Sequence, residues 1–226
     1  MGFLNPVFIL SILIALTVHE WAHAFVANRL GDPTAREMGR LTLNPIAHLD
    51  PMGTILFLLV GFGWGKPVPV DHRYFDHPKR DTALVAAAGP VSNLVLAFAA
   101  FIALNLLGLS VEGDSILSFL FQPSGENTLT TFFTQFLLSS VFVNLGLMAF
   151  NLLPIAPLDG SKVLQMFVPL RYEQAYEDIM QWGPYILLFL LIAERFVNFP
   201  FLSAWIETIM MFILTVFTTI VNLFPF

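Results

Sequence analysis

The chain has 226 residues, of which 57% are hydrophobic and only 12% are charged, and its mean hydropathy is +0.77. Soluble domains carry about 25% charged residues, so this composition excludes an ordinary soluble protein and indicates a polytopic membrane protein. The net charge of −6 is scattered over loops, so we expect no basic surface and no nucleic acid partner. The chain has no cysteine, which leaves His, Asp and Glu as metal ligands.

The first predicted helix covers residues 5 to 29 and can cross a hydrocarbon core of about 30 Å. It carries His19, Glu20 and His23 in an otherwise apolar run. The two histidines are four positions apart, so both imidazoles project from one face and can bind a single metal ion. HExxH on a helix is typical of zinc hydrolases, whose glutamate takes a proton from water. A structural role is the alternative, but ionisable groups in a membrane segment are costly and usually functional.

The region after this helix is expected to be irregular. Residues 34 to 51 are polar and contain prolines, which predicts an interfacial loop or short strands. Residues 52 to 65 hold only about twelve apolar residues among several glycines, which predicts a re-entrant segment and not a span. Residues 66 to 70, Lys-Pro-Val-Pro-Val, predict an extended stretch.

The rest of the chain alternates apolar segments with short loops. Pro90 is expected to kink the second span, and an acidic loop follows that span. The predicted helices cover residues 82 to 109, 129 to 153, 161 to 168, 183 to 197 and 200 to 224. We therefore expect an all-α polytopic membrane protein, a bundle of about five to six transmembrane helices with a re-entrant or extended segment after the first. A single integral membrane domain should cover 1–226, with its C-terminal transmembrane segments at 183–224.

The basic residues predict an orientation. Seven of the ten fall between the first and second spans, so this region should be cytoplasmic by the positive-inside rule. The N-terminus and the acidic loop at residues 110 to 127 should then lie outside. The histidines would lie in the cytoplasmic half of the first helix. The seven residues are Arg29, Arg36, Arg40, Lys66, Arg73, Lys79 and Arg80.

A third metal ligand is needed, because two imidazoles leave a tetrahedral zinc site one protein ligand short when one position is kept for water. The carboxylates in the later segments are Asp159, Glu194 and Glu207. Asp159 is the strongest candidate, because it follows two prolines that break the helix and precedes Gly160, which lets the backbone turn inward. Glu194 is expected to pair with Arg195, and Glu207 to lie near the outer end of its segment.

Three motifs in order resemble the site-2 protease family of intramembrane zinc metalloproteases, in a minimal form without a PDZ insertion. They are HEWAH in the first span, AGPVSN in the second and NLLPIAPLDG at the end of the third. The likeness runs from about Val7 to Gln165 and includes NPIAHLDPMGT and FGWGKPVPV. It implies one Zn²⁺ per chain, held by His19, His23 and Asp159, with Glu20 as the catalytic base.

The resemblance also implies that Asn151, and more weakly Asn93, contact the substrate. From the residues alone, Asn151 could equally cap the broken end of the third span. Asn93 more plausibly satisfies backbone groups that Pro90 leaves unpaired.

The function that the resemblance implies is zinc-dependent endopeptidase cleavage of transmembrane proteins within or near the bilayer, as in regulated intramembrane proteolysis. The catalytic core would be about 5–170. The expected partners are a transmembrane substrate and membrane lipid, and the expected location is a prokaryotic cell membrane, with the active site toward the cytoplasm. The alternative is a zinc-binding membrane adaptor or transporter without proteolytic activity. An adaptor needs no glutamate between the histidines, so Glu20 favours the enzyme.

Overall fold

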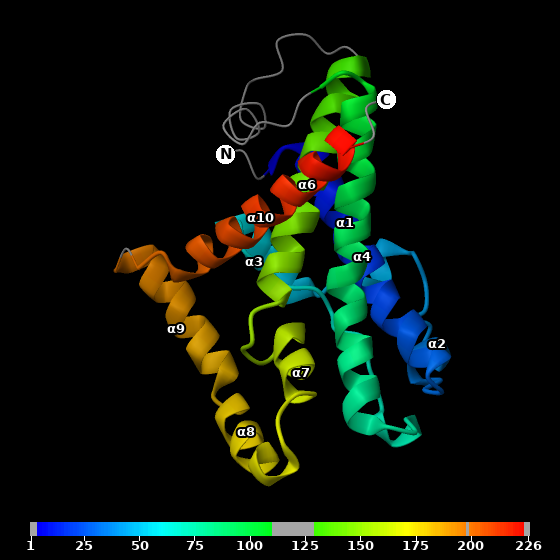
Figure 1. The fold of residues 1–226 in the computed structure, drawn as a ribbon, viewed down its shortest axis with the longest axis vertical. Coiled ribbons are helices and arrows are strands. Elements are labelled where there is room, and N and C mark those ends of the chain that lie inside the picture. The colour runs from blue at the N-terminus through cyan, green and yellow to red at the C-terminus, as the bar shows by residue number, and fades with distance from the viewer. Residues whose placement is uncertain (1–3, 110–128, 198, 224–226) are drawn as a thin grey trace.

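The computed structural model describes residues 4–109, 129–197 and 199–223 (Figure 1). In these ranges the regular elements are helices, and the only β pairing is an isolated antiparallel bridge between Leu49 and Gly65. The predicted all-α class is therefore confirmed. The α-helices are α1 (Pro6–Arg29), α2 (Thr34–Glu37), α3 (Pro51–Val60), α4 (Pro78–Leu106), α6 (Leu129–Asn151), α7 (Asp159–Gln165), α8 (Glu173–Met180), α9 (Gly183–Phe196) and α10 (Phe201–Leu223).

Four of these helices, α1, α4, α6 and α10, are long and apolar enough to cross a membrane. A fifth span is possible if the segment Leu170–Met180 and α9, which are bent by 50° relative to each other, count as one. The second span begins earlier than expected, because Pro78 starts the helix and Asp81 accepts the N–H of His77 at 3.0 Å. The acidic loop predicted at residues 110 to 127 lies outside the described residues.

A repeated sequence signal starts three of the helical segments, an Asn or Asp followed by proline. Before α1, the Asn5 side chain accepts the N–H of Val7 at 2.9 Å. Asn44 and Asp50 act in the same way at the 3₁₀ helix η2 (Pro45–His48) and at α3. Each side chain satisfies a free N–H of the first turn, and proline there has no N–H to satisfy.

The segment between α1 and α4 differs from the expected structure in one part and agrees with it in another. Residues 34 to 51 form α2 and η2 instead of short strands. The glycine-rich segment begins as α3, whose ten residues span only about 15 Å. Gly61, at φ +79°, ends this helix in the left-handed region. The chain then folds back until Gly65 pairs with Leu49. The two ends of the segment therefore lie together, as expected of a re-entrant segment.

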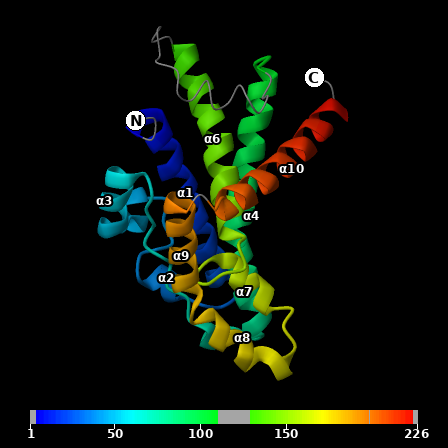
Figure 2. The same ribbon diagram turned by 90° about the vertical axis from the view of Figure 1, so that its left-hand side faces the viewer.

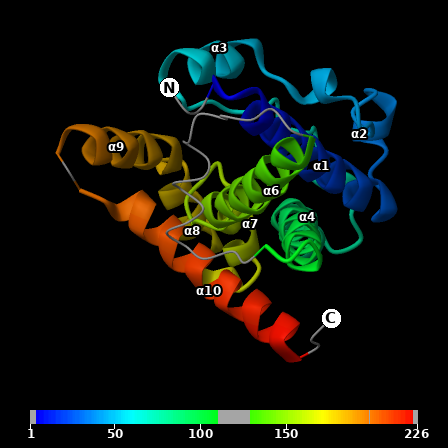
Figure 3. The same ribbon diagram turned by 90° about the horizontal axis from the view of Figure 1, so that it is seen from above.

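The centre of the molecule is formed by α1, α4 and α6, which lie side by side in Figures 1 and 3. Small buried residues let α1 and α4 approach closely, among them Ala15, Ala24, Ala86 and Gly89. α6 and α10 pack on the other part of α4 through a cluster of larger apolar side chains. The buried members of this cluster are Ala97, Ala100, Phe101, Leu104, Leu138, Val141, Leu145, Met148, Met210 and Phe217.

The last helices are less tightly packed. α9 rises from the end where α7 and α8 lie, and α10 returns at an angle across α6 (Figure 2). The only buried residues of α9 are Gly183 and Ala193. Glu194 does not pair with Arg195 in the described structure, which corrects the expectation. Its carboxylate instead accepts the N–H groups of Leu202 and Ser203, each at 3.0 Å, and so caps the start of α10.

Candidate metal centre

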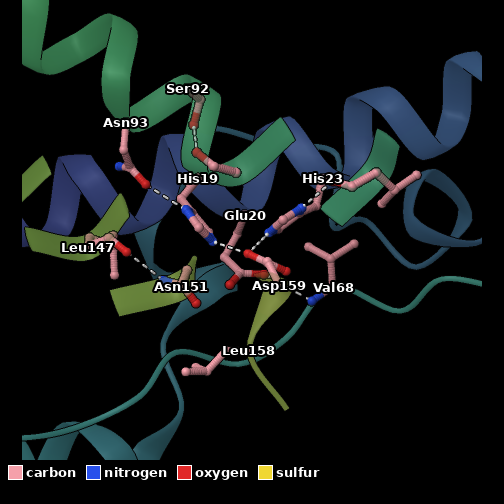
Figure 4. Close-up of polar contacts among 12 residues, drawn as sticks. His19, Glu20, His23, Val68, Ser92, Asn93, Leu147, Asn151, Leu158 and Asp159 are labelled. Atoms are coloured by element: carbon pink, nitrogen blue, oxygen red, sulfur yellow. Dashed lines mark hydrogen bonds and ion pairs between the residues drawn. The ribbon is translucent and has the colours of Figure 1, made fainter. Parts of the chain in front are cut away.

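The structure brings together the three residues that were expected to bind metal (Figure 4). His19 and His23 project from α1, and Asp159 is the first residue of α7. Asp159 Oδ2 lies 3.2 Å from Nε2 of His19 and 3.3 Å from Nε2 of His23. The three ligand atoms lie within 4.8 Å of one another, and all three residues are buried. Asp159 can reach the histidines because α7 packs against α4 beside α1.

The other ring nitrogen of each histidine has an oxygen partner. His19 Nδ1 lies 2.6 Å from Oδ1 of Asn93, and His23 Nδ1 lies 2.7 Å from the carbonyl oxygen of Val85. These oxygens can only accept a hydrogen bond, so each Nδ1 carries the proton. A neutral ring with its proton on Nδ1 has its Nε2 lone pair free for a metal ion, and both Nε2 atoms face Asp159.

This arrangement fits a zinc ion. Two imidazole nitrogens and a carboxylate oxygen converge here, and Asp159 Oδ2 is buried without a hydrogen bond. Ligand atoms about 2.0–2.1 Å from a tetrahedral ion lie roughly 3.3 Å apart, close to the separations from His19 and His23 to Asp159. Two protonated imidazoles could make the same contacts as ion pairs, but at the cost of two neighbouring buried cations. One divalent cation satisfies all three atoms together.

Gly89 of α4 leaves the space that such an ion needs. A Cβ atom at this position would lie 2.5 Å from Nε2 of His23 and 2.6 Å from Nε2 of His19. Any larger residue would therefore displace the imidazoles or fill the site. The motif AGPVSN was used only for the family resemblance, and this steric role was missed.

Asn93 is fully buried and its Oδ1 lies beside His19. A contact between Asn93 and substrate stays a prediction. The Asn93 Nδ2 donates to Oδ1 of Asn144 at 2.8 Å and to the carbonyl oxygen of Ala15 at 3.2 Å. It therefore does not pair with the backbone that Pro90 interrupts. These contacts turn the Asn93 Oδ1 toward His19 and fix the protonated nitrogen of that ring.

Asn144 was missed by sequence reasoning. It is buried in α6 and donates through Nδ2 to the carbonyl oxygen of Ser140 at 2.8 Å, which leaves its Oδ1 for Asn93. The available signal was a second asparagine in an apolar span, seven residues before Asn151. An amide in such a segment needs a partner from another helix.

Glu20 lies beside the three ligand residues and is held by the extended stretch of residues 66 to 70 (Figure 4). Its Oε2 accepts the N–H of Val68 at 3.0 Å. The stretch is itself anchored, because Arg40 Nη2 donates to the carbonyl oxygen of Lys66 at 2.6 Å. Lys66 N–H in turn donates to the carbonyl oxygen of His48 at 2.8 Å. The contact between Glu20 and Val68 was not expected from the sequence.

Asn151 lies at the end of α6 and lines the same cavity as Glu20 and Asp159. Its Nδ2 donates to the carbonyl oxygen of Leu147 at 2.9 Å, which is the helix-end role that was one of its two expected functions. A contact between Asn151 and substrate stays a prediction.

A large apolar cavity opens beside the candidate centre. Its volume is about 1180 Å³, and it is bounded by α1, α3, α4, α6, α7, α9 and α10. His19, Glu20, His23 and Asp159 line one part of it, and most of the remaining wall is hydrophobic. Such a cavity can take an apolar polypeptide segment next to the ionisable residues.

Comparison with known proteins gives a consistent result. The model of peptidase family M50 matches residues 7–193. A Bacillus subtilis (strain 168) protein, provisionally named zinc metalloprotease YwhC, is 40% identical over 212 residues, which cover 92% of this chain and 90% of that protein. A Mycolicibacterium smegmatis protein, provisionally named zinc metalloprotease Rip2, is 32% identical over 208 residues, which cover 88% of this chain and 70% of the relative. No solved structure gives a significant match.

Proposed function

Because the chain belongs to peptidase family M50, we propose that it is a zinc-dependent endopeptidase that cleaves transmembrane proteins within or near the bilayer. The observation that carries the proposal is the convergence of the Nε2 atoms of His19 and His23 on Asp159, with Glu20 beside them in an apolar cavity. The described residues contain four candidate membrane spans. We further propose that the whole chain forms one protease domain.

His19, His23 and Asp159 would hold the ion, and Glu20 would serve as the base. Zn²⁺ would supply Lewis acidity to the scissile carbonyl and to the attacking water. Glu20 would take the proton from that water and pass it to the leaving amine. The Val68 N–H fixes the direction of the Glu20 carboxylate during this transfer. Asn151, on the wall of the cavity, would bind the substrate backbone.

The substrate must unwind before it is cleaved, because the carbonyl groups of a transmembrane helix are satisfied internally. The extended stretch of residues 66 to 70 passes Glu20 and could pair with an unwound segment. Pro67 and Pro69 have no N–H, and the N–H of Val68 is bound to Glu20. Over these three residues the stretch can therefore offer only carbonyl acceptors. If replacing residues 66 to 70 left the cleavage of every tested substrate unchanged, this role would be wrong.

Substrate entry is proposed to require the last two helices to move apart from α1 and α3. α9 and α10 border the cavity and are the least buried of the long helices. A crosslink between α9 and α3 should therefore block cleavage of transmembrane substrates. Unimpaired cleavage by the crosslinked protein would exclude this route.

The proposed location is a prokaryotic cell membrane, with the active site toward the cytoplasm. The end of the molecule formed by the C-terminus of α1, the N-terminus of α4 and α7 carries most of the basic residues. Cytoplasmic segments are enriched in Lys and Arg, which supports this orientation. The relatives reported above come from bacteria.

The experiment measures zinc content and cleavage of single-span peptides in detergent for the wild type, Glu20→Gln and Asp159→Ala. If the chain is a peptidase, the wild type and Glu20→Gln should each bind about one zinc per chain, and only the wild type should cleave the peptides. Asp159→Ala should lose zinc. An adaptor or transporter would bind zinc but cleave no peptide, and Glu20→Gln would behave like the wild type. A transporter is also disfavoured because His19, His23 and Asp159 gather at one place and do not follow a path across the spans.

A further inference from the structure

One glycine in the wall of the cavity has no structural explanation. Gly146 lies inside α6, a 23-residue helix, where glycine is less stable than alanine. Glycine is usually needed in a helix for a left-handed backbone or for close contact with another chain segment. Among the described residues the glycines with positive φ are Gly31, Gly39, Gly61 and Gly108.

Close packing does not require it either. A Cβ atom built on Gly146 would have no atom within 4 Å, apart from its own helix backbone and chain neighbours. By contrast, a Cβ on Gly89 or Gly160 would lie less than 3.0 Å from neighbouring atoms. Gly146 therefore faces open space, and this space belongs to the cavity that contains Glu20.

The residues on either side give this space its shape. Phe142 and Phe150 lie four positions before and after Gly146, so the three share one face of α6, and all three line the cavity. The ring of Phe150 also meets Phe62 of the re-entrant segment, with 6.5 Å between ring centroids. Gly146 is thus the floor of a notch between two phenylalanine side chains.

We propose that this notch is a subsite for one large apolar side chain of the substrate, an inference that rests on the proposed peptidase function. The flanking Phe142, Leu147 and Phe150 offer no charged partner, so a charged side chain there would lose its hydration without compensation. Gly146 lies about 7.5 Å along the helix axis from Asn151. An extended substrate advances about 3.3 Å per residue, so the subsite is roughly two residues from the one beside Asn151.

The test uses single-span peptides that differ at one position near the cleaved bond, scanned in turn and carrying Ala, Val, Leu or Phe. The quantity measured is the ratio of kcat/KM for the Leu or Phe peptide to that for the Ala peptide. For the wild type we expect one position at which this ratio is about tenfold or more. Gly146→Leu fills the notch and should reduce that ratio to about one or below, and Gly146→Ala should reduce it partly.

Zinc content and melting temperature are measured for every variant, and the smaller Gly146→Ala carries the test if Gly146→Leu does not fold. Val95→Phe is the matched control, because Val95 is 61% exposed and does not line the cavity. It should leave the ratio at the wild-type value. A wild type that cleaves with no size preference, or Gly146 variants that keep its preference, would overturn the subsite alone. A zinc-loaded wild type that cleaves no peptide would overturn the peptidase function as well.

Discussion

Asn93 Oδ1 lies 2.6 Å from Nδ1 of His19, and the orientation of this amide is set by Asn144 on a third helix. Replacing Asn93 by Leu removes the acceptor that keeps the proton on Nδ1. We expect the zinc affinity to fall about 10- to 100-fold, the usual effect of losing a partner behind a metal ligand. Asn144→Leu should cause a smaller loss, because Asn93 keeps its bond to Ala15.

Competition with a chelator of known affinity measures these changes. Asn105→Leu is the control, because Asn105 is in the same helix but its side chain bonds, among the described residues, only the carbonyl oxygen of Phe101 at 2.9 Å. Asn144→Asp should restore most of the affinity lost in Asn144→Leu, because a carboxylate can still accept from Asn93. Equal affinities for Asn93→Leu and Asn105→Leu would rule out the positioning role.

We expect the zinc site to tolerate alanine at Gly146 but not at Gly89. A methyl group at Gly89 would lie 2.5 to 2.6 Å from the Nε2 atoms of His19 and His23, whereas at Gly146 it would meet open space. Gly89→Ala should therefore lose zinc, although alanine favours a helix. Gly146→Ala should keep about one zinc per chain. Elemental analysis of both purified proteins decides this, and zinc retained by Gly89→Ala would contradict the steric role.

Removal of the metal should reverse the relative stability of wild type and Asp159→Asn. Without the ion, Asp159 faces the two Nε2 lone pairs with no donor, whereas an Asn side chain can donate its N–H to one of them. At pH 9, above the ordinary imidazole pKa of about 6.5, the apo form of Asp159→Asn should melt at a higher temperature than apo wild type. Saturating zinc should restore the wild type as the more stable protein. A wild type that is more stable in both states would contradict the convergence of unprotonated atoms.

Val68→Pro removes the N–H that Glu20 accepts, with little change to an already extended backbone. We expect kcat to fall while the zinc content stays the same, because the base loses its fixed direction. Val70→Pro is the control: it adds a proline directly after Pro69, but the N–H of Val70 donates to no other described residue. A steady-state comparison of the two variants suffices. Equal loss of activity in both variants would mean that the stiffness of residues 66 to 70 matters for catalysis and that the N–H of Val68 does not.

Glu194→Ala should loosen the start of α10, because two N–H groups lose their acceptor. Loss of a helix cap costs about 0.5–2 kcal/mol, so hydrogen exchange at Leu202 and Ser203 should speed up roughly 2- to 30-fold. Arg195→Ala should leave that exchange unchanged, since the described structure has no ion pair between Arg195 and Glu194. Faster exchange in both variants would point to general loosening of α9.

The sequence predicts well what depends on neighbouring residues. The length of α1, the helical spacing of His19 and His23 and the break around Pro154 and Pro157 are all local, and all were expected. Asp159 could be found because few carboxylates occur in the later apolar segments. These features need no knowledge of which helices touch.

The features that were missed depend on contacts between distant segments. Asn93 meets Asn144 of another helix, and Glu20 meets Val68 of the extended stretch. The expected pair of Glu194 with its neighbour Arg195 is wrong because the Glu194 carboxylate instead accepts N–H groups at the start of α10, a contact between two helices. Short strands were wrong for residues 34 to 51 because the Asn and Asp caps before proline start helical turns there.

The run Pro67-Val68-Pro69 allows only one register beside α1. A shift of one residue in either direction would place a proline nitrogen, which cannot donate, opposite Glu20. The buried carboxylate would then lose the partner that it has at 3.0 Å. A substrate that pulled on this stretch could bend it but could not slide it by one residue without that loss. The two prolines therefore keep the N–H of Val68 opposite Glu20.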